Sequence, residues 1–129
     1  MSYSRRRGAR SVSMLQGEHG TIHREAGSVV ALGYPASYRV GASSLGAQTV
    51  YRTLNTVAGL ACTRFFTPEK GPVPRPLITL ETGRPVSESA AIAFSIACET
   101  ELLQVVALLS AAGLEPLSKN RDDGNAETT

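Results

Sequence analysis

The stretch AAIAFSIACETELLQVVALLSAAG, residues 90–113, decides the fold of this chain of 129 residues. Two structures compete for it: a single long helix, or a strand that runs directly into a helix. In residues 90–97 large apolar side chains alternate with alanine and serine. Ile92 and Phe94 would lie about 200° apart on a helix and would leave it no polar stripe. The alternation therefore favours a strand, with a hinge at Cys98–Thr100 before the helix.

The second half of this stretch, residues 100–113, has a strong helical pattern. Thr100 is a residue type that caps helix starts, and Gly113 is placed for a left-handed C-terminal cap. The apolar stripe consists of Leu102, Val105, Val106 and Leu109. Leu103 and Leu108 lie outside this stripe, and a helix that is apolar on nearly all sides needs more than one sheet to cover it. Either the chain's own loops or a partner chain must supply the cover, and the shortage of other segments favours a partner.

Upstream of the helix the chain indicates a sheet that spans residues 28–97. Residues 11–25 have the pattern of a short N-terminal hairpin around two glycines. Further strands are expected over residues 29–32, 37–40, 49–55, 61–66 and 77–81. Pro35 should end the first of these strands because proline donates no ladder hydrogen bond. Residues 67–76 contain four prolines and a glycine, which predict a semi-rigid loop.

Composition indicates one folded domain, residues 1–129. The hydrophobic content is 42%, the charged content is 19% and the formal net charge is +2. No apolar run reaches the roughly 18 residues that a membrane span requires, so a soluble protein is expected. The positive charge gathers in a basic arm, residues 1–10, which attracts polyanions. Residues 115–129 form a polar tail.

No group of residues predicts catalysis. His19 and His23 have no nucleophile near them in sequence, and exposed turn histidines are much commoner than catalytic ones. Cys62 and Cys98 have no CxxC companion, so each is interpreted as a small buried hydrophobe rather than a metal ligand. No glycine-rich phosphate-binding motif occurs. The sequence therefore predicts no enzyme, no cofactor and no metal site.

The order of these elements resembles the coat proteins of levivirus-like single-stranded RNA bacteriophages. The closest local likeness is AFSIACETELLQVVALLSAAG, which is similar to the family's last strand, acidic junction and leucine-rich helix. The resemblance implies an α+β fold with an N-terminal β-hairpin and an antiparallel sheet of about five strands. The C-terminal helix would interlock with that of a second chain across a dimer. The implied function is a capsid (coat) protein, located in the virion and assembled in the host cytoplasm, whose dimers form a T = 3 icosahedral shell around single-stranded RNA.

This interpretation assigns roles to particular residues. The RNA-binding residues would be Arg5, Arg6, Arg7, Arg10, Tyr51, Thr53 and Arg64. The dimer interface would contain Leu103, Leu108 and Phe94. The expected partners are a second copy, further copies in the shell and single-stranded RNA, with neither a membrane nor a small-molecule substrate.

Two other functions remain open on the sequence. One is a small dimeric nucleic-acid-binding regulator, whose basic arm follows a groove and whose long helix, residues 90–113, dimerises. The other is a ligand-binding or enzyme subunit whose site forms only between two chains.

Overall fold

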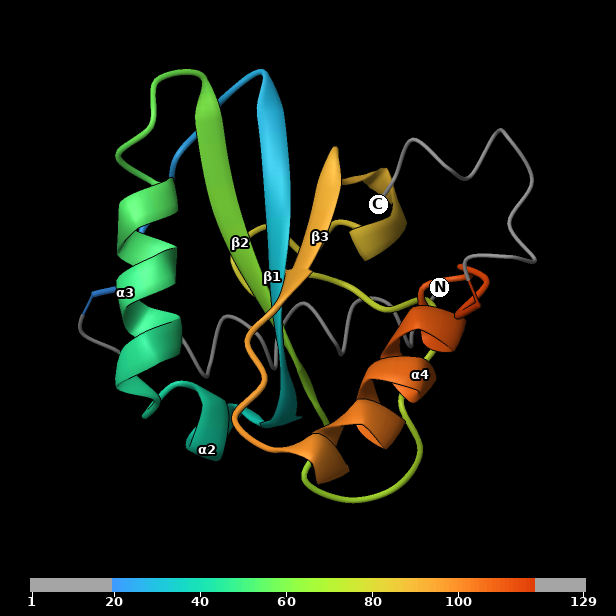
Figure 1. The fold of residues 1–129 in the computed structure, drawn as a ribbon. Coiled ribbons are helices and arrows are strands. Elements are labelled where there is room, and N and C mark those ends of the chain that lie inside the picture. The colour runs from blue at the N-terminus through green and yellow to red at the C-terminus, as the bar shows by residue number, and fades with distance from the viewer. Residues whose placement is uncertain (1–19, 118–129) are drawn as a thin grey trace.

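The computed structural model describes residues 20–117, and Figure 1 shows a small parallel sheet with helices on both of its faces. The strands and helices in chain order are β1 (Ser28–Ser37), α2 (Tyr38–Gly41), α3 (Leu45–Leu54), β2 (Leu60–Thr67), the 3₁₀ turn η1 (Val86–Glu88), β3 (Ala91–Phe94), the 3₁₀ turn η2 (Glu99–Glu101) and α4 (Leu102–Ala111). The strand order is β2-β1-β3. Val30 in the central strand lies opposite both Cys62 and Ala91, and both pairings are parallel.

The predicted fold class is wrong, because the sheet formed by the described residues has three parallel strands and not about five antiparallel ones. Parallel strands cannot be joined by a hairpin and need a crossover, which helix α3 supplies between β1 and β2. The described part of the predicted hairpin, residues 20–25, contains no strand. The basic arm, the rest of the hairpin and residues 118–129 lie outside the described residues.

Residues 49–55, expected as a strand, lie mostly in helix α3. The buried side chains of Ala47, Tyr51 and Asn55 recur every fourth residue, which places them on one helix face. Val50 is exposed on another side. The helix begins after Ser44, whose hydroxyl accepts a hydrogen bond from the Ala47 N–H at 3.3 Å. The alternation of side chains that predicted a strand therefore belongs to a helix, in which the buried side chains recur about every four residues.

Two further strand boundaries differ from the prediction. Strand β1 does not stop before Pro35 but continues to Ser37, with an irregular register between Tyr34 and Ser37 that accommodates the proline. Most of residues 37–40 belong to α2. Residues 77–81 join no sheet strand; Ile78 forms an isolated antiparallel bridge with Pro85. The strand over residues 61–66 is confirmed, and so is the loop over residues 67–76 apart from Thr67, which is the last residue of β2.

The stretch at residues 90–113 is a strand followed by a helix, as predicted. Strand β3 is short, however, and lies at an edge of the sheet. The helical turns start at Glu99 rather than after Thr100, and the Glu101 carboxylate accepts the Ala97 N–H at 2.7 Å. Gly113 has φ 81° and the Leu114 N–H bonds to the Leu109 carbonyl at 2.9 Å, which confirms the C-terminal cap.

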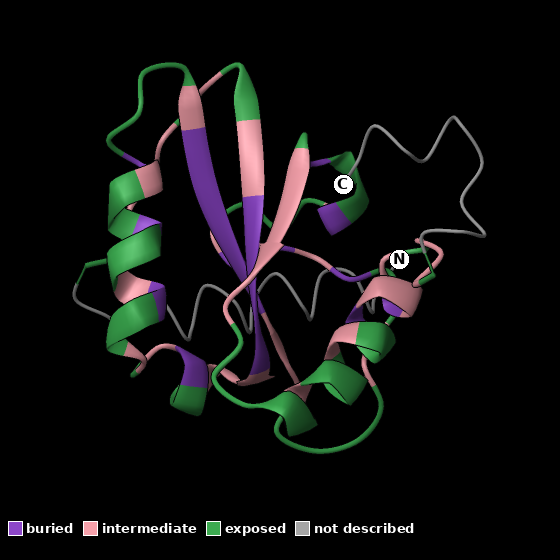
Figure 2. Ribbon diagram, in the orientation of Figure 1, coloured by how far each residue is buried: buried purple, intermediate pink, exposed green. Residues whose placement is uncertain are grey.

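The core lies on both faces of the sheet (Figure 2). On one face α4 packs over β1 and β2, and Leu108 is fully buried among Ala31 and Phe65. On the other face α3 covers the sheet, and Tyr51 packs on Leu32 and Cys62. No described helix is long and apolar enough to cross a membrane.

Gly33 in the central strand lies directly beneath two aromatic rings. A Cβ atom at this position would lie 2.4 Å from Phe65 Cζ and 2.9 Å from Phe94 Cδ1. The rings of Phe65 and Phe94 meet edge to face, with centroids 5.6 Å apart. The absence of a side chain at residue 33 therefore lets both rings pack against the backbone of β1.

Candidate functional site

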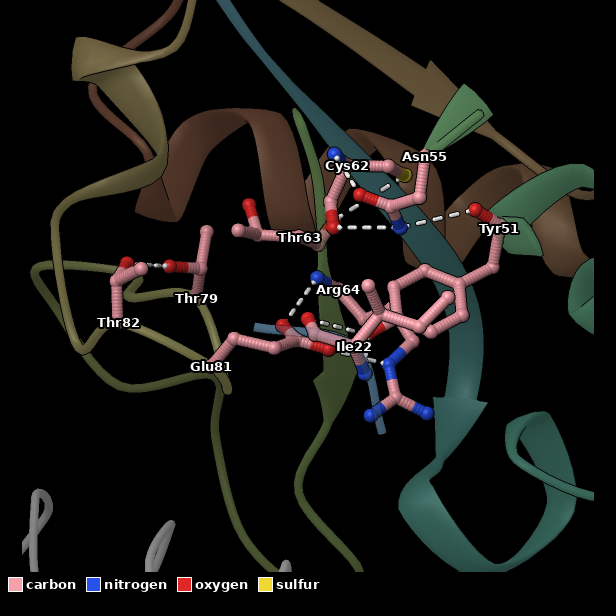
Figure 3. A network of polar contacts seen from close by, with 9 residues as sticks. All are labelled: Ile22, Tyr51, Asn55, Cys62, Thr63, Arg64, Thr79, Glu81 and Thr82. Atoms are coloured by element: carbon pink, nitrogen blue, oxygen red, sulfur yellow. Dashed lines mark hydrogen bonds and ion pairs between the residues drawn. The ribbon is translucent and has the colours of Figure 1, made fainter. Parts of the chain in front are cut away.

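The outer edge of β2 is hydrogen-bonded by groups from distant parts of the chain (Figure 3). Asn55 Oδ1 accepts the Cys62 N–H at 2.9 Å, and Asn55 Nδ2 donates to the Cys62 carbonyl at 3.3 Å. Two residues further along β2, Glu81 Oε2 accepts the Arg64 N–H at 2.7 Å, and the Leu80 N–H donates to the Arg64 carbonyl at 2.7 Å. These groups occupy the place that a neighbouring strand would take.

A buried ion pair joins β2 to the segment that contains Glu81. Arg64 Nε lies 2.5 Å from Glu81 Oε1, and the two side chains are 10% and 1% exposed. The Arg64 guanidinium carbon lies 4.4 Å from the centre of the Tyr51 ring, so its charge also meets the ring face. The pair fixes residues 77–82 against the sheet edge.

The groups next to this ion pair are held in their neutral forms. Burial, and then the negative charge of Glu81, raise the pKa of the Tyr51 phenol. Its hydroxyl donates to the Ile22 carbonyl at 3.1 Å and accepts the Ile22 N–H at 2.9 Å. The same two causes raise the pKa of the Cys62 thiol to about 12. Tyr51 therefore anchors the chain before β1, and Cys62 is a thiol rather than a thiolate.

A polar cleft of about 500 Å³ opens beside this network. Its lining residues are Arg24, Glu25, Ala26, Val29, Thr63, Thr79, Thr82, Arg84, Pro85, Glu88 and Ser89. A second hollow of about 340 Å³ shares Arg24, Glu25, Thr63 and Thr82 with it. The two hollows therefore adjoin each other beside β2.

The hydroxyl of Thr63, in the wall of the cleft, has an unusual environment. Thr63 is 4% exposed, and its hydroxyl has no hydrogen-bond partner among residues 20–117. In Figure 3 its side chain extends to the same side as Thr79 and Thr82, whose hydroxyl oxygens are 2.7 Å apart. A buried hydroxyl without a partner costs roughly 1–3 kcal/mol. Thr63 lines the cleft, so the open space nearest to this hydroxyl belongs to the cleft.

The structure places the predicted RNA-binding residues in different settings. Arg5, Arg6, Arg7 and Arg10 lie outside the described residues. Tyr51 and Arg64 come together, but both are buried in the network rather than displayed on an open sheet face. Thr53 is exposed on α3.

The structure also places the predicted interface residues in different environments. Leu108 is fully buried inside the chain's own core, and Phe94 packs against the same cluster. Leu103 is 78% exposed. The expectation that the helix needs a partner chain to cover Leu108 is therefore wrong, because the sheet itself covers it.

Cys62 is buried as predicted, whereas Cys98 is exposed. Sequence reasoning missed Glu81 and Thr63 as site residues, and nothing local distinguishes them. It also missed the burial of Asn55, for which the four-residue spacing of Ala47, Tyr51 and Asn55 was a signal.

A comparison with protein-family models matches residues 46–126 to the family described as "Radical SAM proteins, N-terminal". The chain belongs to this family. The match covers nearly all of α3 together with β2, β3 and α4, and it begins after β1. No curated protein and no solved structure matches the chain.

Membership of the radical SAM family overturns the coat-protein interpretation. The predicted capsid function and the location in a virion are wrong with it. The family points to an enzyme and to a small-molecule substrate, S-adenosylmethionine, so the predictions of a non-enzymatic protein and of RNA and coat subunits as partners are corrected too. The resemblance misled because it depended on a strand–helix order that an α/β protein also contains.

The family implies an iron–sulfur cluster, which cysteine thiolates hold. The chain has two cysteines, and Cys62 is a buried neutral thiol. Cys98 is exposed, and its sulfur lies 3.0 Å from the Thr100 hydroxyl. Within residues 20–117 no three His, Cys, Asp or Glu side chains gather to hold a metal ion. The residues of this chain therefore do not fit such a cluster.

Proposed function

We propose that this chain binds a small polar molecule in the cleft beside β2, as the ligand-binding region of a radical SAM enzyme whose cluster is held by other residues. The observation that carries the proposal is the Thr63 hydroxyl, which is buried at the cleft wall without a partner among the described residues. Nearly all buried polar groups in folded proteins are hydrogen-bonded, so a ligand is the natural partner.

The construction of the cleft supports this function. The volume of about 500 Å³ lies within the range of roughly 300–1,000 Å³ that small-molecule sites have. One wall, residues 79–89, is held in place by bonds from Glu81 and Leu80 to Arg64. A wall that is already fixed lowers the entropy lost on binding.

The experiment is an NMR titration of the isotopically labelled full chain with a panel of organic acids, amino acids and nucleosides. We expect at least one compound to give saturable shifts centred on the backbone amides of Thr63, Thr79 and Thr82. Thr63→Val keeps the side-chain shape and should weaken the binding of that compound about tenfold, which corresponds to about 1.4 kcal/mol.

Thr53→Val is the matched control, because Thr53 is exposed on α3 and does not line the cleft. It should leave the affinity unchanged. The proposal is overturned if no compound gives saturable shifts at the cleft, or if Thr63→Val binds as tightly as the wild type.

A further inference from the structure

The cleft contains charged side chains of both signs in equal number, two arginines and two glutamates. Arg24 and Glu25 come from the segment before β1, and Arg84 and Glu88 come from the wall that follows the turn at Gly83. Each of these two segments therefore supplies one positive and one negative group.

These four charges form no ion pair with one another or with any other residue in 20–117, where the ion pairs are Arg39–Glu69 and Arg64–Glu81. The Arg24 guanidinium donates through Nη1 to the Asn55 carbonyl. Arg84 and Glu88 make no side-chain hydrogen bond within the described residues. The cleft thus offers an arginine and a carboxylate whose charged groups are available to a ligand.

We infer that the ligand is a small zwitterion of the amino-carboxylate class, with its carboxylate on Arg84 and Thr63 and its ammonium on Glu88. The inference rests on the proposed function and names the ligand class. A guanidinium binds a carboxylate through two parallel N–H groups, and the Thr63 hydroxyl donates a further hydrogen bond. The Glu88 carboxylate accepts from the ammonium.

Other ligand classes fit the charges less well. A phosphate or other polyanion meets Glu25 and Glu88 in the same cleft, and these carboxylates offset the attraction of the two arginines. A polycation meets the two arginines. A neutral polyol bonds the threonine hydroxyls but leaves all four charges uncompensated. A zwitterion alone compensates both signs at once, and like charges in the wall weaken the binding of singly charged competitors.

The test uses three forms of one probe: an α-amino acid, its N-acetyl derivative, which keeps only the carboxylate, and its carboxamide, which keeps only the amine. A set of small, acidic, basic and aromatic amino acids supplies the probes. Calorimetry and NMR with the full chain should show that the best free amino acid binds about tenfold or more tightly than both of its derivatives.

Substitutions of the two charged residues test which of them binds the carboxylate of the ligand and which binds the ammonium. Arg84→Gln should weaken the amino acid and the N-acetyl form but not the carboxamide, and Glu88→Gln should weaken the amino acid and the carboxamide but not the N-acetyl form. Arg52→Gln is the control, because Arg52 is exposed on α3 and does not line the cleft.

The outcomes separate the two proposals. If both derivatives bind as tightly as the amino acid, or if only compounds of other classes shift the cleft amides, the zwitterion inference fails while the proposed binding function stands. If no compound of any class binds, both fail.

Discussion

The outer edges of the two edge strands, β2 and β3, have different neighbours. The outer backbone groups of β2 bond to Asn55, Leu80 and Glu81, so this edge is paired although no strand of residues 20–117 lies there. Strand β3 pairs within residues 20–117 only with β1. After it, α4 exposes Leu102, Leu103 and Val106. Polar groups and the candidate cleft therefore gather at one edge, and exposed apolar side chains follow the other.

This difference shows that the two sides of the sheet are held by different interactions, with the buried ion pair at the β2 edge. A buried charge is expensive unless it is paired, and the Arg64–Glu81 pair sits at the edge that carries the cleft. The α4 side is held by burial of a few apolar side chains, chiefly Leu108. The following substitutions test whether the two sides depend on these different interactions.

The largest effect is expected at the β2 edge, from Glu81→Ala. It leaves the Arg64 charge buried and removes the acceptor of the Arg64 N–H, so the free energy of unfolding should fall by about 3–5 kcal/mol. Urea denaturation of the full chain measures it. The control is Glu69→Ala at the exposed Arg39–Glu69 pair, which should cost less than about 1 kcal/mol. Equal losses for the two variants would contradict the role given to the buried pair.

On the α4 side, two leucines of one helix should behave differently. Leu108→Ala should cost about 2–5 kcal/mol because it opens a cavity in the core. Leu103→Ala removes a side chain that is 78% exposed and should change stability by no more than about 0.5 kcal/mol. Both follow from urea denaturation. A large loss for Leu103→Ala would mean that this side chain is covered in solution.

At the cleft wall a substitution should stabilise the protein. Thr63→Val removes a buried hydroxyl that has no partner among residues 20–117 and should raise the free energy of unfolding by about 1–3 kcal/mol. Thr79→Val, in which the lost hydroxyl was bonded to Thr82, should lower it by about 1 kcal/mol. Thermal denaturation without ligand compares the two. Destabilisation by both would show that Thr63 already has a partner.

The smallest structural change is chemical modification of the cysteines. In the native protein at pH 8, iodoacetamide should alkylate the exposed Cys98 and spare Cys62, since the thiol of Cys62 is buried and its pKa is about 12. Mass spectrometry locates the label, and both residues should react in urea. Rapid native alkylation of Cys62 would contradict its burial.

The raised pKa of the Cys62 thiol also makes the free energy of unfolding depend on pH. Between pH 9 and about 12 the unfolded thiol loses its proton while the native thiol keeps it, so this contribution to stability is complete below pH 9 and falls as the pH rises. Cys62→Ala should remove that part of the decline.

The sequence was informative where one local pattern dominated. The change of period within residues 90–113 and the glycine at 113 predicted a strand, a hinge and a capped helix, and these are present. Residues 49–55 were ambiguous, because Tyr51 and Asn55 satisfy a period of two as well as a helical spacing. Interpreting them as a strand removed the crossover helix that a parallel pair of strands requires, and the element order then resembled a family with an antiparallel sheet.

The candidate site was less predictable than the fold. Tyr51 and Arg64 were singled out for their chemistry, but their partners are distant in sequence: Glu81 lies 17 residues from Arg64, and Ile22 lies 29 residues from Tyr51. Such pairings depend on how the turn over residues 77–86 packs on β2, which no local periodicity encodes. That the Thr63 hydroxyl has no partner among residues 20–117 is visible only once those residues are placed in space.

Gly33 has a consequence for how this sequence can evolve. Any side chain at position 33 collides with the rings of Phe65 and Phe94, so a mutation away from glycine is accepted only after both rings have been replaced by smaller side chains. A smaller ring alone leaves a cavity in the core. Positions 33, 65 and 94 therefore form an epistatic set, in which each single step is harmful and only joint change is neutral.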